Sequence, residues 1–229
     1  MEGRIAHTLD GVVSERAPGR TPVRNAYLKS WRKRCLDVAG ALSIGLVLSP
    51  VIAVVVVAMA FQNGPIVFGH ERIGHRGKRF CCYKFRSMIH DADRVLNELL
   101  ERDPSARAEW ERNFKLKSDP RVTRLGAFLR KTSLDELPQL WNVFKGEMSL
   151  VGPRPIVREE LIRYGRGARF YLSTRPGLTG LWQVSGRSDI VYGRRIAMDR
   201  KYSERASLFV DFSIVAKTVL VVLKVKGAY

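Results

Sequence analysis

One charge-free stretch decides the fold of this chain: Val38-Ala39-Gly40-Ala41-Leu42-Ser43-Ile44-Gly45-Leu46-Val47-Leu48-Ser49-Pro50-Val51-Ile52-Ala53-Val54-Val55-Val56-Val57-Ala58-Met59-Ala60-Phe61. At about 1.5 Å per residue, a continuous helix of this length would cross a hydrocarbon core about 30 Å thick. Pro50, at its middle, removes one backbone hydrogen bond and presses on the carbonyl of Leu46, and the Ser49 hydroxyl can bond back to a carbonyl. The sequence therefore predicts a membrane segment with a hinge at Ser49-Pro50.

The flanks of this segment predict its topology. Both are basic: Arg24, Lys29, Arg32, Lys33 and Arg34 precede the segment, and Arg72, Arg76, Lys78, Arg79, Lys84 and Arg86 follow it. The positive-inside rule places both flanks in the cytoplasm, so residues 31–62 should enter one leaflet, turn at the hinge and return. A kinked spanning helix is the alternative, because membrane helices tolerate proline. A signal peptide fits less well, because the run starts after a long basic tail.

Length and charge bound the rest of the chain. Its 229 residues predict a flexible basic tail over 1–30, the membrane segment over 31–62 and one cytosolic catalytic domain over 63–229. Forty basic against 22 acidic residues give a formal charge of +18, which favours polyanions or an anionic surface as partners. Three cysteines without CxxC spacing and four histidines without paired metal spacing argue against disulfides and a zinc site.

Local patterns in residues 62–229 predict an α+β, mostly helical domain. Residues 62–77 are expected to be a connector, residues 80–86 a strand, and residues 91–117 two surface helices broken at Pro104. Residues 156–172 read as a helix that fades at Gly165 and Gly167, and residues 175–187 as a glycine-punctuated loop with at most a short extended piece. The apolar residues 208–225 predict a core helix or, preferably because of their lysines, a helix in the membrane interface.

The chemistry is expected in Thr132-Ser133-Leu134-Asp135-Glu136-Leu137-Pro138-Gln139-Leu140-Trp141-Asn142. Pro138 is tolerated if Asp135 is about the N-cap of a helix and Pro138 lies in its first turn. The two carboxylates would then lie at a helix mouth, where free N–H groups and the positive dipole end favour anions. The structural alternative is a simple capping box formed by Ser133 and Glu136.

Arginines surround this dyad in segments that read as loops. They are Arg121, Arg124 and Arg130, with Lys131, upstream, and Arg154, Arg158, Arg175 and Arg187 downstream. Guanidinium forks match phosphate oxygens, and a carboxylate can hold a divalent cation. The combination indicates a metal-bound, phosphate-rich substrate.

Five ordered motifs carry a family resemblance: Lys84-Phe85-Arg86-Ser87-Met88, Asp119-Pro120-Arg121-Val122-Thr123, Leu129 to Gln139, Met148-Ser149-Leu150-Val151-Gly152-Pro153-Arg154-Pro155, and Pro176-Gly177-Leu178-Thr179-Gly180. With them the chain, from about Trp31 onward, resembles the bacterial sugar transferases, which are monotopic polyprenyl-phosphate phosphoglycosyl transferases. The resemblance implies a re-entrant helix hinged at a Ser-Pro pair and an enzyme at the cytoplasmic face of the bacterial inner membrane. The chain lacks the further membrane helices of larger members, so we expect a minimal enzyme.

The resemblance also implies residue roles. Asp135 is expected to be the nucleophile that attacks the sugar-bearing phosphorus of a UDP-sugar, releases UMP and passes the phosphosugar to undecaprenyl phosphate. Mg²⁺ is the expected ion, held by Asp135, because it prefers a few oxygens plus substrate phosphate. Glu136 would orient the metal or handle a proton. Phosphate contacts are expected from Arg130 and Arg154 with Lys84 in support, and nucleotide or sugar contacts from Gln183 and Arg187. Galactose-1-phosphate or glucose-1-phosphate is the first expectation for the transferred group.

Three other functions compete with this interpretation. A nucleic-acid-binding protein would explain the charge, but it needs no charge-free segment, and no nucleic-acid module is present. A non-catalytic basic membrane scaffold would explain the anchor and its flanks, with the dyad as a capping box. A conventional glycosyltransferase would release UDP in place of UMP. Besides the substrates, inner-membrane lipids are the expected partners, and the sequence leaves open whether the protein is a homo-oligomer.

Overall fold

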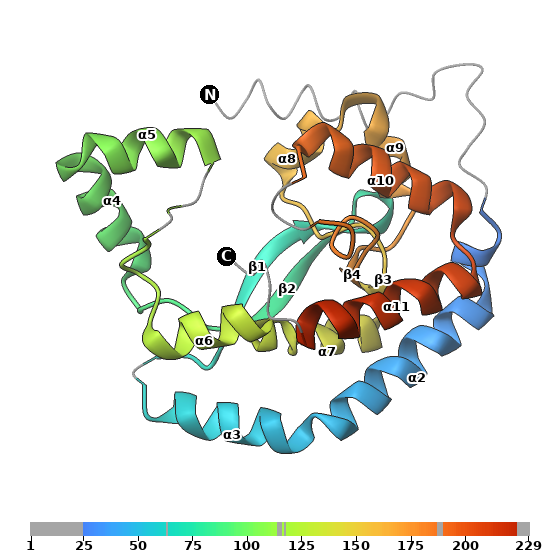
Figure 1. Cartoon of the computed structure of the whole chain (residues 1–229), viewed down its shortest axis with the longest axis horizontal. Coiled ribbons are helices and arrows are strands. Elements are labelled where there is room, and N and C mark those ends of the chain that lie inside the picture. Colours follow the sequence, from blue (N-terminus) through green and yellow to red (C-terminus); the bar gives the residue numbers. More distant parts are fainter. Residues whose placement is uncertain (1–24, 63, 114–115, 117, 187–189, 224–229) are drawn as a thin grey trace.

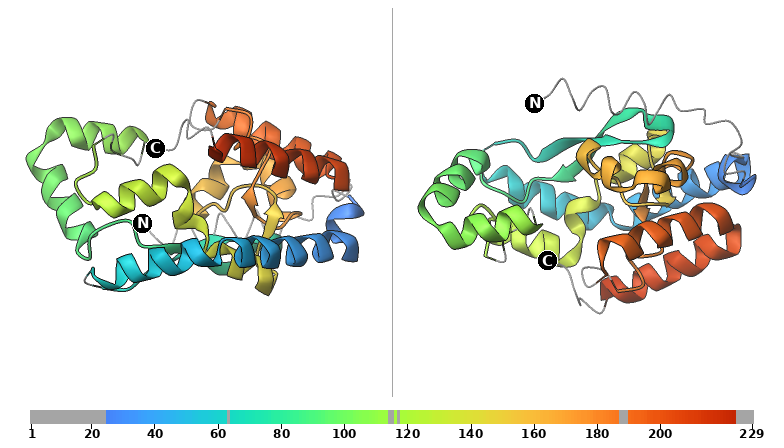
Figure 2. Two further views of the ribbon diagram at one scale, coloured as in Figure 1. Left: turned by 60° about the horizontal axis from the view of Figure 1, so that its bottom comes forward. Right: turned by 90° about the horizontal axis from the view of Figure 1, so that it is seen from above.

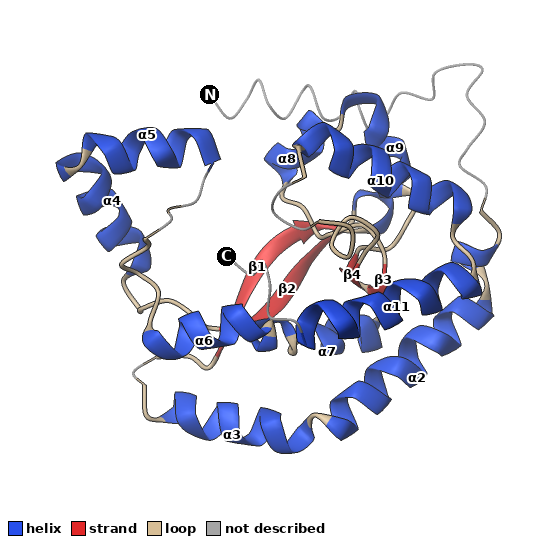
Figure 3. Cartoon of the chain, viewed as in Figure 1, coloured by secondary structure: helices blue, strands red, loops and turns tan. Residues whose placement is uncertain are grey.

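The computed structural model describes residues 25–62, 64–113, 116, 118–186 and 190–223. The fold is α+β and mostly helical, as the sequence predicts (Figure 3). The α-helices are α2 (Trp31–Val47), α3 (Ser49–Ala60), α4 (Ala92–Arg102), α5 (Pro104–Asn113), α6 (Arg124–Thr132), α7 (Gln139–Lys145), α8 (Arg158–Arg163), α9 (Ala168–Leu172), α10 (Tyr192–Arg205) and α11 (Leu208–Leu223). Single 3₁₀ turns are η1 (Tyr27–Lys29), η2 (His75–Gly77), η3 (Leu134–Glu136) and η4 (Gly165–Gly167), and the strands are β1 (Val67–Ile73), β2 (Arg79–Phe85), β3 (Ser149–Val151) and β4 (Gly177–Thr179).

The charge-free stretch forms two helices with a break at the predicted hinge. Helix α2 ends at Val47, and α3 begins at Ser49 with the proline in its first turn. The Ser49 hydroxyl donates a hydrogen bond of 2.8 Å to the Leu46 carbonyl, as expected for a residue that widens a bend. The two helices meet at 63°, and together they have the length and hydropathy of a membrane segment, whereas no single described helix does.

Helices α2 and α3 lie along one side of the molecule (Figure 1). On their inner face, Ala41 of α2 joins the main hydrophobic core, and Val55 and Met59 of α3 pack with Phe85 and Leu129 in a second cluster. Their outer face is apolar and exposed at Leu42, Leu46, Val47, Val54 and Val57. Both halves of the bent pair therefore pack against the same globular body.

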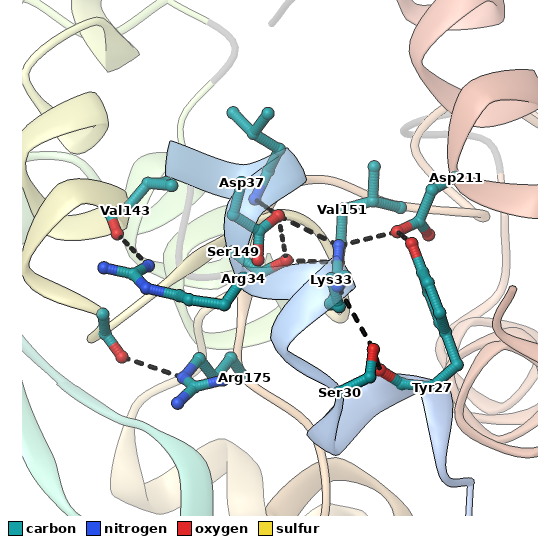
Figure 4. A network of polar contacts seen from close by, with 12 residues as sticks. Tyr27, Ser30, Lys33, Arg34, Asp37, Val143, Ser149, Val151, Arg175 and Asp211 are labelled. Atoms are coloured by element: carbon teal, nitrogen blue, oxygen red, sulfur yellow. Dashed lines mark hydrogen bonds and ion pairs between the residues drawn. The ribbon is translucent and has the colours of Figure 1, made fainter. Parts of the chain in front are cut away.

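A buried polar network fastens the start of α2 to the body (Figure 4). The Lys33 ammonium lies 3.0 Å from the Asp37 carboxylate and 2.7 Å from that of Asp211, and all three side chains are at most 3% exposed. Asp37 also accepts hydrogen bonds from the Ser149 hydroxyl and the Leu150 N–H, both in β3. Helix α2, strand β3 and helix α11 are thereby held together through charged groups.

The chain before α2 joins the same network. The Tyr27 hydroxyl of η1 donates a hydrogen bond of 2.7 Å to Asp211, and the Asn25 amide donates one of 2.9 Å to the Ala206 carbonyl. Residues 25–30 of the predicted tail are thus packed on the body, and residues 1–24 lie outside the described residues.

Strands β1 and β2 form an antiparallel ribbon in which Val67 pairs with Phe85 and Ile73 with Arg79. The predicted strand at 80–86 is confirmed within one residue. The predicted connector over 62–77 is wrong, because it contains β1, whose first five residues are exposed and show no inward-facing alternation. In β2, Phe80, Cys82 and Phe85 are buried, and this strand carries Lys84 toward the dyad.

Among the remaining helices, α6 and α10 were not predicted from the sequence, whereas α4, α5, α8, α9 and α11 lie in segments predicted to be helical. Helices α4 and α5 break before Pro104 as predicted and extend away from the rest of the fold (Figures 1 and 2). The helix expected to fade near residue 165 resumes as α9 after a 3₁₀ turn. Helix α11 buries Asp211 and Ile214 and exposes Phe209, Phe212 and Val219, so its inner face belongs to the core.

Candidate active site

Asp135 lies in a 3₁₀ turn between two helices and does not cap a helix. Helix α6 ends at Thr132, the left-handed backbone of Ser133 (φ 59°) then reverses the chain, and η3 follows at Leu134–Glu136. The next helix, α7, has Pro138 at its N-cap and starts only at Gln139. The expectation that Asp135 is the N-cap of a helix is therefore wrong, because the turn at Ser133 ends one helix and the 3₁₀ turn separates it from the next.

The capping-box alternative is also wrong. The Ser133 side chain makes no capping hydrogen bond. The Glu136 carboxylate instead accepts a hydrogen bond of 2.6 Å from the Lys84 ammonium, across from β2. The same ammonium lies 3.6 Å from Asp135 Oδ2. Lys84 thus bridges the two carboxylates, and the dyad faces the ribbon.

Asp135 is only 8% exposed. Burial raises the pKa of its carboxyl above the usual value, and the neighbouring Glu136 adds to that rise, whereas Lys84, Arg130 and Arg154 act against it. The three cations therefore favour the ionised carboxylate, whereas desolvation favours the protonated form. An ionised carboxylate with little hydration is a better nucleophile than a fully solvated one.

Arg130, in the last turn of α6, is close enough to Asp135 for their charges to interact. Its Nε donates a hydrogen bond of 2.8 Å to the Ser87 hydroxyl, which fixes the guanidinium next to the end of β2. Burial lowers the pKa of Arg130, and the nearby charges of Asp135 and Asp119 raise it. Arg121 does not bind at the dyad but pairs with Asp119, whose carboxylate accepts two hydrogen bonds from its guanidinium, at 2.8 and 2.7 Å.

Arg154 reaches the dyad from the loop after β3, with its Nη1 3.9 Å from Glu136 Oε1. That loop is positioned by the parallel pairing of β3 with β4, in which Ser149 pairs with Gly177. The two backbones approach so closely that a Cβ on Gly177 would overlap the backbone of Gly152. Glycine at both positions is therefore what brings the Gly152-Pro153-Arg154-Pro155 and Pro176-Gly177 motifs together.

These elements enclose one pocket. It is lined by four of the predicted residues, Lys84, Glu136, Arg154 and Gln183, and by residues the sequence analysis did not select: Arg72, Cys82, Gln139, Pro155, Gly177 and Leu178. Arg72 was missed because the sequence of β1 is typical of a connector. Gln139 was missed because nothing in the sequence marks it except its position four residues after Asp135. The Gln183 Nε2 donates to the Leu178 carbonyl at 3.3 Å, and its buried Oε1 has no partner among the described residues.

The bacterial sugar transferase family model matches residues 28–225 of the chain. The chain belongs to the bacterial sugar transferase family. Similar proteins of this family include a UDP-galactose-lipid carrier transferase of Erwinia amylovora, 53% identical over 86% of this chain and 41% of that protein. Another is an undecaprenyl-phosphate galactose phosphotransferase of Salmonella typhimurium, 52% identical over the same shares. The exopolysaccharide production protein ExoY of Sinorhizobium fredii is 50% identical over 86% of this chain and 88% of its own length.

The chain spans about two fifths of the length of the first two of these sugar transferases. One predicted site residue of this family member, Arg187, lies outside the described residues. Lys84, Glu136, Arg154 and Gln183 line the same pocket, although they are supplied by β2, η3 and the two loops that follow β3 and β4. Asp135 is not among the lining residues and lies 3.6 Å from the Lys84 ammonium, and Arg130 of α6 is also outside the lining.

The donor set of this family member fits a magnesium ion whose coordination substrate oxygens would complete. No group of three or more His, Cys, Asp or Glu side chains gathers anywhere in the described part of the chain. Mg²⁺ is typically held by one or two carboxylates together with substrate phosphates and water. Asp135 fits that requirement, because its carboxylate is buried and supplies oxygen ligands beside the Lys84 ammonium.

Proposed function

We propose that this sugar transferase transfers a hexose-1-phosphate from a UDP-sugar to undecaprenyl phosphate, with Asp135 as the covalent nucleophile. The observation that carries the proposal is a buried carboxylate bordered by Lys84, Arg130 and Arg154, in a family whose members include proteins named for phosphotransfer to undecaprenyl phosphate. Guanidinium groups match phosphate oxygens, and the buried carboxylate supplies an attacking oxygen between them.

In the first step, a carboxylate oxygen of Asp135 attacks the sugar-bearing phosphorus of the UDP-sugar. The new bond joins that oxygen to phosphorus. The bond that breaks is the one between this phosphorus and the bridging oxygen, which leaves as part of UMP with the electron pair. Arg130, Arg154 and Lys84 bind the phosphate oxygens and offset their charge. A magnesium ion bound by Asp135 would supply further neutralisation of the phosphate charge.

In the second step, an oxygen of undecaprenyl phosphate attacks the same phosphorus. The bond to Asp135 breaks, and the carboxylate is restored with its electron pair. The product is undecaprenyl diphosphate carrying the sugar, and no net proton is consumed when the acceptor is a dianion. The reaction would prime exopolysaccharide or related glycan synthesis.

The donor pocket supports a nucleotide sugar as substrate. The unpartnered Gln183 Oε1 is an acceptor that a sugar hydroxyl or the uracil N–H can satisfy, and its orientation is fixed because its Nε2 faces the Leu178 carbonyl. Galactose or glucose is the proposed sugar. The names of the Salmonella relative and of an undecaprenyl-phosphate glucose phosphotransferase of Komagataeibacter xylinus, 33% identical over 87% of this chain, support these two.

The membrane arrangement is part of the proposal. Helices α2 and α3 both pack on the globular body and present apolar outer faces, which supports a re-entrant pair dipping into one leaflet, because a spanning pair would have to separate α3 from its contacts with Phe85 and Leu129. The basic flanks support a position at the cytoplasmic face of the bacterial inner membrane, in contact with its lipids.

The deciding experiment follows the covalent intermediate. Purified protein is incubated with UDP-galactose or UDP-glucose, radiolabelled in the sugar, without acceptor lipid. The wild type should acquire label in step with UMP release. Asp135→Asn, which keeps the side-chain size but not the charge, should remain folded and acquire none. The control is Asp93→Asn, at an exposed aspartate of α4.

Each competing function predicts a different product. Release of UDP would show conventional glycosyl transfer. Neither nucleotide would be released by a scaffold. Label on the Asp135→Asn protein would show that another residue is the nucleophile.

A further inference from the structure

Arg86 is a half-buried cation that the proposed reaction leaves unused. It directly follows β2, and its backbone N–H donates a hydrogen bond of 3.0 Å to the Ile66 carbonyl, just before β1. Its Nε and Nη1 are completely shielded from solvent and have no hydrogen-bond partner among the described residues. The other orphaned buried side-chain atoms of the described chain are oxygens, in Asp37 and Gln183.

Other arginines of this fold are well satisfied. Asp119 accepts two hydrogen bonds from Arg121, and the carbonyls of Val143 and Phe144 accept one each from Arg34, both at 2.6 Å. Removing a guanidinium from water without replacing its hydrogen bonds is costly. An anion that binds at Arg86 would remove this cost, which makes the guanidinium a candidate ligand site.

The position of Arg86 is at the boundary between the apolar helix pair and the dyad. Its predecessor Phe85 packs against Val55 and Met59 of α3. Lys84, two residues earlier, holds Glu136. The next residue, Ser87, holds Arg130. An anion at Arg86 would therefore lie where the apolar helices end and the phosphate-binding side chains begin.

Gly64, in the turn between α3 and β1, lies against the guanidinium. Its φ is 102°, and a Cβ at this position would overlap Nη1. The ring of His90 is the next group on this side. No acidic side chain is paired with the Arg86 guanidinium in the described chain, so an incoming anion has no internal competitor.

We propose that Arg86 binds the phosphate group of a membrane lipid and, given the proposed function on which this part rests, the terminal phosphate of the polyprenyl acceptor. A lipid with its chain in the bilayer carries its phosphate at the apolar–polar boundary, where Arg86 lies. A guanidinium binds phosphate oxygens through two parallel hydrogen bonds. Arg86 would hold the acceptor while Asp135 carries the phosphosugar.

The kinetic test separates the two half-reactions. Arg86→Gln should raise the KM for undecaprenyl phosphate by about tenfold to a hundredfold, the effect of losing a charge-assisted hydrogen bond. UMP release without acceptor should change far less. The matched control is Arg79→Gln, which removes the same charge from the other end of β2, where the side chain is 55% exposed. An equal fall in both half-reactions would contradict the proposal.

The binding test does not depend on turnover. Vesicles of phosphatidylcholine, with added undecaprenyl phosphate or added phosphatidylglycerol, are titrated with wild-type protein, Arg86→Gln and Arg79→Gln. Arg86→Gln should lose the extra binding that undecaprenyl phosphate confers and keep that conferred by phosphatidylglycerol. Equal loss on both kinds of vesicle would assign Arg86 to bulk anionic lipid and overturn its assignment to the acceptor.

Thermal unfolding distinguishes a ligand site from a structural arginine. Because the guanidinium is unpaired in the free protein, Arg86→Gln should unfold at the same temperature as the wild type or higher. Inorganic phosphate should raise the unfolding temperature of the wild type and of Arg79→Gln more than that of Arg86→Gln. An Arg86→Gln protein that is destabilised or fails to fold would show a structural role and overturn the inference. If the wild type releases no UMP, the proposed function fails, whereas these two binding tests still decide on Arg86.

Discussion

At Arg154 and Arg130, the shape of the guanidinium should matter as much as its charge. Lysine at either position keeps one positive charge but loses the planar fork that binds two phosphate oxygens. We expect Arg154→Lys and Arg130→Lys each to lower the transfer rate by one to a few orders of magnitude, about 2 to 4 kcal/mol in the barrier, by analogy with the loss of one oxyanion donor. Steady-state rates with a UDP-sugar and undecaprenyl phosphate measure this.

The control for these variants is Arg205→Lys, at an exposed arginine in the last turn of α10. It should transfer at the wild-type rate. Near-wild-type rates from both Arg154→Lys and Arg130→Lys would remove these residues from the proposed phosphate clamp.

The buried carboxyl of Asp199 should make the free energy of unfolding depend on pH, independently of catalysis. Burial raises the pKa of its carboxyl to about 7, although the Tyr164 hydroxyl, which donates a hydrogen bond of 2.8 Å, acts in the opposite direction. The folded protein thus keeps a proton that the unfolded chain releases near pH 4. This contribution to stability is complete below about pH 4 and is lost as the pH rises through about 7, by at most about 1.4 kcal/mol per pH unit.

Asp199→Asn should remove this dependence, because asparagine does not titrate and still offers Tyr164 an acceptor. The free energy of unfolding, measured by denaturant titration between pH 4.5 and 7.5 (about the range that the two pKa values span), should then fall less steeply than in the wild type. Asp93→Asn, at an exposed position, serves as the control. Identical pH profiles for the wild type and Asp199→Asn would refute the assignment.

At the scale of elements, the break between α2 and α3 should decide the membrane topology. Replacing Ser49 with leucine and Pro50 with alanine removes the proline clash and the hydroxyl that bonds to Leu46, so a continuous helix becomes favourable. We expect this double variant to favour a spanning state that carries the N-terminal tail across the membrane. A membrane-impermeant thiol reagent can detect this in an Asp10→Cys protein whose Cys35 and Cys81 are changed to serine.

With the hinge intact, the thiol introduced by Asp10→Cys should be labelled only from the cytoplasmic side, and in the double variant from the outside. Outside labelling without the hinge substitutions would show that the tail already crosses the membrane, and the re-entrant interpretation would be wrong.

At the scale of the whole molecule, the network around Lys33 joins the bent helix pair to the catalytic part. Lys33→Met leaves the fully buried carboxylates of Asp37 and Asp211 without their cation. Removing one partner of a buried ion pair costs about 3 to 5 kcal/mol, so we expect a loss of that size in the free energy of unfolding. Lys29→Met, at an exposed lysine of η1, should have little effect.

A second substitution tests the cause of that loss. Adding Asp211→Asn to Lys33→Met removes one of the two stranded charges and should recover part of the stability, a coupling that a double-mutant cycle measures. Purely additive losses would show that the charges do not interact.

Much of this architecture could be predicted from local patterns. The hinge at Ser49-Pro50 follows from proline chemistry, the break at Pro104 likewise, and the strand, predicted at 80–86 and found one residue earlier, from its aromatic and apolar residues. Strand β1 could not be predicted, because its residues are largely exposed and are held only by pairing with β2, so no inward-facing period marks them.

In the candidate site, too, some features could be predicted from the sequence and others could not. The sequence by itself determined the residue types at the site, the Asp135-Glu136 dyad and the arginine-bearing motifs, because a reactive carboxylate and phosphate-binding guanidiniums are set by side-chain chemistry. Only the tertiary structure decided their arrangement. Ser133 turns Asp135 out of the predicted helix cap, Lys84 reaches the dyad from a strand about fifty residues earlier, and the backbone contact of Gly152 with Gly177 delivers Arg154. Contacts between segments so far apart in the chain leave no periodic signal in the sequence, because only folding brings those segments together.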